Sequence, residues 1–119
     1  MVNIVNVGTI NSKHQFIATV GTGSGSSFTA VPSNKIWRVN SLILSNVDGV
    51  NNVDATVVHN DGAGTDYTIY YTLVIPADGA LVALDKTMGV NLTAGETIKV
   101  IAGAAGDLNA ILYYDEISE

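Results

Sequence analysis

The feature that most constrains the fold of this chain is a ten-residue stretch, residues 66–75, in which side-chain character alternates with a period of two. Alternation that is rich in β-branched and aromatic residues is typical of a β-strand with one face turned to a core. We therefore expect a strand at Asp66–Ile75. Its core-facing side is predicted to carry Tyr67, Ile69, Tyr71, Leu73 and Ile75.

Similar short runs recur along the chain, separated by clusters of Gly, Pro, Asn and Asp that are typical of turns. No window of ten or more residues follows the 3.6-residue period of an amphipathic helix. The pattern predicts one all-β domain over residues 1–119, an antiparallel two-sheet β-sandwich or jelly-roll-like fold with eight or nine short strands. The other expected strands are Ile4–Val7, Gln15–Val20, Ser27–Val31, Lys35–Ser45, Ala55–His59, Ala80–Leu84, Thr97–Ala102 and Leu108–Ile117.

Within the expected strand at 35–45, the alternation of inward and outward side chains is interrupted. Trp37 and Val39 share one face, whereas the two leucines that follow fall on the other. Either a β-bulge at Asn40-Ser41 re-aims the side chains, or the strand is central and covered on both faces. In both cases we expect Trp37 and Val39 in the core.

The charge content indicates contacts with other chains. Only 13% of the residues are charged and 47% are hydrophobic, whereas a typical soluble domain is about 25% charged. This composition favours a homo-oligomer whose surface is partly covered; the alternative is a monomer with a neutral surface of Asn, Thr, Ser and Gly. The net charge of −6 divides into +3 over residues 1–47 and −9 over residues 48–119, and an acidic chain with scattered bases argues against nucleic-acid binding.

The sequence offers little that could support catalysis. Its two histidines, His14 and His59, lie in no recognised motif, and neither a G-x-S-x-G elbow nor an H-E-x-x-H pair is present. The glycine-rich segment at 21–27 lacks the lysine that a phosphate-binding loop requires. We therefore predict that the protein is not an enzyme and uses no cofactor, metal or small-molecule substrate.

Two residue groups leave other interpretations open. Aspartates in loops rich in Asn and Gly could bind calcium, although Asp is also a common turn residue; these are Asp48, Asp54, Asp61 and Asp66. Tyrosines could form a sugar-binding platform or could pack between strands; these are Tyr67, Tyr70, Tyr71, Tyr113 and Tyr114.

The first thirteen residues contain no acid and consist of a short apolar strand, then Gly8, then a polar link. They fit either an ordinary first strand or an arm that adds to the sheet of a neighbouring subunit. They lack the basic start and long apolar run of a signal peptide, and no stretch of the chain is apolar for the roughly 18 residues of a membrane helix. The predicted interface residues are Val2, Ile4, Val5, Val7, Ile10 and Lys13.

Residues 31–118 resemble small β-sandwich virion proteins of tailed bacteriophages, including those that infect cyanobacteria. The motifs that carry this resemblance are structural, because Pro and Gly set turns while Val and Leu fill a core. Residues 1–30 fall outside it, and the family pattern brings no catalytic residue. The matching segments are Val31–Val39, Ser41–Gly49, Val74–Val82, Leu92–Val100 and Ala105–Ser118.

The resemblance implies a virion structural protein, made in the host cytoplasm and incorporated into the particle. We expect a capsid decoration (cement) protein that trimerises and binds the major capsid protein, or another virion protein, on the outer surface of the head. An accessory protein of the tail, neck or fibre is the first alternative. A carbohydrate-binding module that contacts the host surface is the second.

Overall fold

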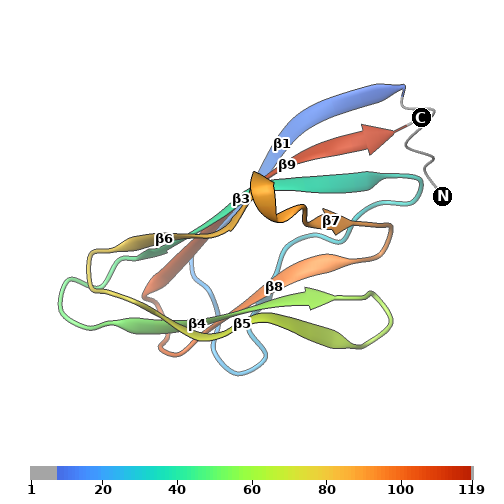
Figure 1. Cartoon of the computed structure of the whole chain (residues 1–119). Coiled ribbons are helices and arrows are strands. Elements are labelled where there is room, and N and C mark those ends of the chain that lie inside the picture. The colour runs from blue at the N-terminus through green and yellow to red at the C-terminus, as the bar shows by residue number, and fades with distance from the viewer. Residues whose placement is uncertain (1–7, 119) are drawn as a thin grey trace.

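A computed structural model describes residues 8–118, and within this range the chain is all-β (Figure 1). Two antiparallel sheets contain nine strands, and the helical content of the described residues is one three-residue 3-10 turn, η2 (Lys86–Met88). This confirms the predicted fold class. The strands are β1 (Thr9–Ile17), β2 (Ser26–Ser27), β3 (Ile36–Asn46), β4 (Val53–Asn60), β5 (Asp66–Ile75), β6 (Ala80–Asp85), β7 (Asn91–Leu92), β8 (Thr97–Ala102) and β9 (Leu108–Ser118).

The first sheet has the strand order β1-β9-β3-β6, and β7 pairs with one end of β3. The first and last strands of the described chain are therefore neighbours, with Thr9 opposite Ser118. Strands β3 and β9 are eleven residues long, and together with β1 they extend beyond the second sheet in Figure 1. This extension gives the molecule its elongated dimensions of 49 × 26 × 21 Å.

The second sheet has the order β2-β8-β4-β5, so β5 is its exposed edge strand. The core lies between the two sheets. Leu42 and Leu112 contribute to it from the first sheet, and Val57 and Val100 from the second, each with 0% exposure. Burying an aliphatic side chain of this kind contributes about 1.5–3 kcal/mol, so these inward positions stabilise the contact between the sheets.

A β-bulge in β3 confirms the irregularity that the sequence indicated. The register against β9 shifts between Val39 and Ser41, which leaves Asn40 as the extra residue. Because the bulge reverses the alternation, Leu42 faces the core on the same side as Trp37 and Val39. Trp37 and Val39 are 3% and 1% exposed, as predicted.

The face assignment along β5 was wrong for its middle. Two register shifts occur between β4 and β5, and Thr72 adopts a left-handed φ of 50°. As a result Tyr70 packs against the core, whereas Tyr71 is 79% exposed. Tyr67, which was also predicted to face the core, is 60% exposed near the start of the strand. Leu73 on this edge strand is only half-buried. A strict period of two cannot anticipate such shifts, because each bulge moves every later side chain to the other face.

Two expected boundaries also differ from the structure. Thr9–Ile17 forms a strand although its first half is polar, because it pairs along its whole length with β9; the expected polar link does not exist there. The strand expected at Ser27–Val31 is reduced to Ser26–Ser27. Beyond it, isolated backbone hydrogen bonds from Phe28 and Val31 attach the chain to the second sheet.

Candidate interaction surface

The outer face of the first sheet can be read from its strand register. Residues that pair directly in an antiparallel sheet project to the same face. Because Trp37, Val39, Leu42 and Leu112 face the core, the residues that alternate with these inward positions in each strand face outward. The outward residues form rows that cross the sheet from β1 through β9 to β3 and β6.

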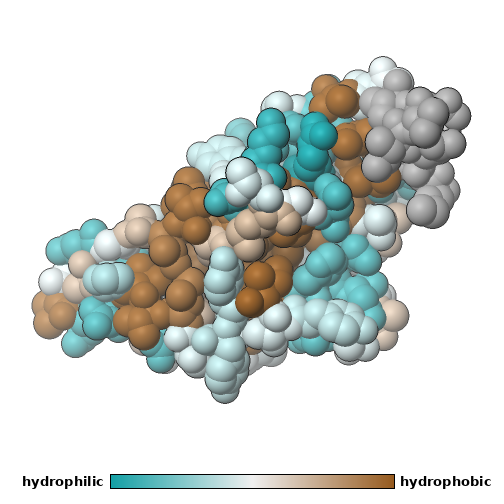
Figure 2. All heavy atoms as spheres, viewed as in Figure 1, coloured by the Kyte–Doolittle hydropathy of each residue, from teal (hydrophilic) through white to brown (hydrophobic). Residues whose placement is uncertain are grey.

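One row is apolar in all four strands. Phe16 on β1 lies opposite Ile111 on β9, Ile111 lies opposite Ile43 on β3, and Ile43 lies opposite Val82 on β6. We call these four residues the apolar row. Phe16 and Val82, at the two ends, are 63% and 56% exposed, while the two isoleucines are half-buried. Figure 2 shows hydrophobic side chains gathered over the region of β6.

The adjacent rows are polar, and many of their side chains contact one another, although the buried Nε of Arg38 and Oδ1 of Asn40 have no hydrogen-bond partner within the described residues. His14 packs on Phe16 with ring centroids 4.8 Å apart and lies 6.2 Å from the ring of Tyr113. In the next row, Asp115 accepts hydrogen bonds from Ser12 (3.1 Å) and Arg38 (3.4 Å). Partial burial would raise the pKa of Asp115, but the side-chain donors Ser12, Asn40 and Arg38, together with the positive charge of Arg38, outweigh it and hold that pKa below its usual value. The carboxylate is therefore neutralised locally.

The predicted interface residues divide between two environments. Ile10 is on the outer face and 53% exposed, opposite Ile117, which is buried with Ile36 in a small separate cluster. Lys13 instead projects to the inner side, where its ammonium lies 2.9 Å from Glu116 of the same chain. Positions 2, 4, 5 and 7 (Val2, Ile4, Val5 and Val7) lie outside the described residues.

A buried carboxylate lies behind the outer face. Glu116 is 7% exposed and accepts a 2.9 Å hydrogen bond from the indole nitrogen of Trp37 as well as the contact from Lys13. Burial raises the pKa of Glu116, but these two donors more than offset it and lower the pKa overall. Trp37 also stacks on Tyr114, with centroids 4.1 Å apart. Both oxygens of this carboxylate have partners, so Glu116 on β9 links Trp37 on β3 with Lys13 on β1 and is not a free acid or base.

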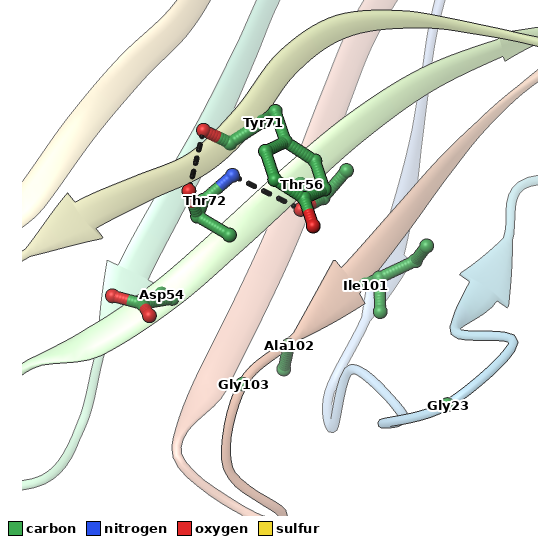
Figure 3. A pocket seen from close by; sticks show the side chains of 8 residues that line it. All are labelled: Gly23, Asp54, Thr56, Tyr71, Thr72, Ile101, Ala102 and Gly103. Carbon is green, nitrogen blue, oxygen red and sulfur yellow. Dashed lines mark hydrogen bonds between the residues drawn. The ribbon is translucent and has the colours of Figure 1, made fainter.

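A shallow hollow of about 310 Å³ lies on the outer face of the second sheet (Figure 3). Tyr71 stands beside it, Asp54 and Thr56 line its β4 side, and Gly103 forms part of its floor. The amide of Thr72 donates to the hydroxyl oxygen of Thr56 (3.1 Å), and the Thr72 hydroxyl donates to the carbonyl of Tyr71 (2.8 Å). The hollow thus combines an exposed aromatic ring with a carboxylate and hydroxyls.

The aspartate loops form turns. Asp48 accepts from the amides of Val50 and Asn51, and Asp61 from those of Ala63 and Thr65. These backbone donors lower the pKa of both aspartates. Within residues 8–118, no three His, Asp or Glu side chains are grouped so that they could hold a metal ion.

The remaining candidates make local contacts. Asp66 is paired with Lys99, and His59 lies 3.1 Å from Glu96. No helix in the described part of the chain is long and apolar enough to span a bilayer.

Sequence reasoning missed the apolar row. Its members come from four strands that are distant in the chain, and each looks like an ordinary apolar residue within its own strand. The available signal was the bulge at Asn40: once it is placed, Ile43 must face outward. Recognising the row also required the β1-β9-β3-β6 order, which local sequence does not encode.

Comparisons with known proteins bear on the fold. No family model matches the sequence, and no curated protein matches it. The chain is similar to a solved structure described as "Bacillus endospore appendages form a novel family of disulfide-linked pili", with a TM-score of 0.55 and 17% sequence identity over 92% of this chain and 88% of that chain. This likeness supports the β-sandwich architecture. The present chain has no cysteine, so it cannot form disulfide links of its own.

Proposed function

We propose that this protein is a structural subunit of a bacteriophage virion that decorates the outer surface of the head and acts through protein–protein contacts. The observation that carries this proposal is the apolar row. Soluble monomers seldom place a continuous apolar stripe across a whole sheet face, and such patches mark interaction sites. The head as the location rests on the resemblance of residues 31–118 to virion proteins.

Other features of the molecule support a structural role. The conspicuous buried carboxylate, Glu116, is held by two donors within the chain, and the loop aspartates are occupied in turns. The similarity to an appendage subunit adds a precedent for this architecture in a protein that assembles. It also makes a subunit of a tail, fibre or other filament the principal alternative.

The hollow beside Tyr71 favours a second candidate, a module that binds carbohydrate on the host surface. Exposed aromatic rings stack on sugar faces, and carboxylates and hydroxyls bind sugar hydroxyls. A glycan array with Tyr71→Ala as its control tests this candidate. Glycan binding that is lost in the variant would support the carbohydrate module over the decoration protein.

Co-sedimentation with purified particles tests the main proposal. The natural chain should bind heads saturably, and gold-labelled antibody should mark the head in electron micrographs. Val82→Asp should weaken binding whether the apolar row contacts the head directly or joins subunits that bind the head together, because a buried carboxylate without a partner is costly in either contact. Val74→Asp is the matched control, because Val74 is equally exposed (55% against 56%) but lies on the other sheet. Labelling of tails alone, or no binding, would refute a head decoration protein.

A further inference from the structure

We infer that the outer face of the β1-β9-β3-β6 sheet is the contact between two copies of this chain, arranged face to face about a two-fold axis. This inference rests on the proposed function, because it assumes a subunit that assembles. It goes further by naming the occupant of the apolar row as a second copy of the same chain, in a two-fold dimer in place of the trimer expected from the resemblance.

The size of the face suits a dimer. The strands β1, β9, β3 and β6 have nine, eleven, eleven and six residues, and at about 3.4 Å per residue and about 4.8 Å between strands each face offers about 600 Å². Two such faces would bury about 1,200 Å² together, which is the lower end of the range of about 1,200–2,000 Å² for stable, specific interfaces. The sheet therefore needs no additional surface to form a stable contact.

The charges on this face permit two copies to approach. The chain carries a net charge of −6, so copies repel each other over most orientations. On the outer face, however, the charge of Asp115 is paired with that of Arg38, and Asp85 lies at the border of the face, on the edge strand β6. Other acids lie away from it, in the loops of Asp48 and Asp61 and on the second sheet. The first sheet is thus the face on which two acidic chains meet with little repulsion.

The apolar row is also self-complementary. A two-fold axis in the plane of the contact superimposes the row of one copy on the row of the other in two ways. If the axis runs along the row, Phe16 lies opposite Phe16 of the second copy and Ile43 lies opposite Ile43. If the axis runs along the strands, Phe16 lies opposite Val82 and Ile43 lies opposite Ile111. Every contact is apolar on both sides, and such a contact closes with two subunits. Sheets packed in this way lie about 10 Å apart.

The edge of the sheet is a poorer alternative for self-association. The exposed edge strand β1 presents the sequence Asn11-Ser12-Lys13-His14 at its centre. Lysine and other polar residues on an edge strand discourage pairing with a second strand, and Lys13 is already bound to Glu116. The contact is therefore expected on the face and not at the β1 edge.

Sedimentation velocity of the natural chain tests this inference, with Phe16→Asp and Val82→Asp as row variants and Val74→Asp as the matched control. We expect a dimer whose dissociation constant rises at least about 30-fold in each row variant, because a two-fold contact contains each substitution twice. Val74→Asp should leave the dimer unchanged. Circular dichroism confirms that each variant is folded.

Cross-linking locates the contact independently. Because the chain has no cysteine, the single variants Ile43→Cys and Ile111→Cys each carry one thiol, which rules out a cross-link within one chain. A short bismaleimide should trap a dimer in one of these variants alone or in their equimolar mixture. The single variants Tyr67→Cys and Tyr71→Cys, on the second sheet, should not be trapped. A monomeric or trimeric mass for the natural chain, or equal weakening by Val74→Asp, would overturn the inference. Particle binding is scored separately: a monomer that still decorates heads would refute the dimer and leave the decoration function standing.

Discussion

Replacing Glu116 with alanine should destabilise the fold by about 2–4 kcal/mol. The variant leaves the indole N–H of Trp37, 3% exposed, without its acceptor, and a hydrogen bond to a charged group contributes about 1.5–3 kcal/mol. It also removes the ion pair with Lys13, whose side chain is 46% exposed, and a pair so open to solvent adds little to the stability of the fold.

Urea unfolding followed by tryptophan fluorescence measures this loss, since Trp37 is the single tryptophan. With a slope near 2 kcal/mol per molar urea, the midpoint should fall by about 1–2 M. Glu116→Gln, which keeps an acceptor oxygen, should lose less. Asp54→Ala is the control, because Asp54 is an exposed carboxylate in β4. If Glu116→Ala lowered the midpoint no more than Asp54→Ala does, the buried carboxylate would have no structural role.

The lowered pKa of Glu116 also predicts how the stability of the fold depends on pH. The pKa of Glu116 is lower in the folded chain than its usual value near 4.3. A depressed carboxylate pKa stabilises the fold at pH values above the unfolded pKa, and that stability is lost as the pH falls through the folded pKa. The free-energy gap between the natural chain and Glu116→Gln should therefore be constant from pH 7 to about pH 5 and shrink below about pH 4. A gap that widened on acidification would contradict the assigned direction.

Three further changes test other parts of the structure by chemical denaturation. Leu84→Ala should cost about 2–5 kcal/mol because Leu84 is 0% exposed in the core, whereas a loss below 1 kcal/mol would contradict its packing. Asn46→Asp should cost about 2–4 kcal/mol at pH 7 and less at low pH, because the amide nitrogen of Asn46 donates to three backbone carbonyls that a carboxylate would face. Thr72→Gly should be neutral or stabilising by up to about 1 kcal/mol, because Thr72 has a left-handed φ of 50°, which strains a residue other than glycine. Thr68→Gly on the same strand should destabilise the fold, and equal losses of stability in the two variants would contradict backbone strain at Thr72.

Local sequence patterns predicted much of this fold and little of its surface. The run at 35–45 located a bulge, because one extra residue in a strand reverses the faces of all the side chains that follow it. The strand character of Thr9–Ile17 was missed, since a polar segment becomes a strand only through pairing with β9. The apolar row was missed for the same reason. Its residues lie on four strands whose order is set by long-range packing, which no local pattern records.

The pairing of β1 with β9 has a consequence for how the chain folds. Ser12 and Asp115 are 103 positions apart and lie side by side, and β9 separates β1 from β3 in the first sheet. During synthesis the first strand therefore has no neighbour until the last one emerges, and contacts between such distant residues slow folding. Throughout that interval β1 is an unpaired strand exposed to other chains. Its polar centre, with Lys13 in the middle, is then a safeguard against premature association with other nascent subunits.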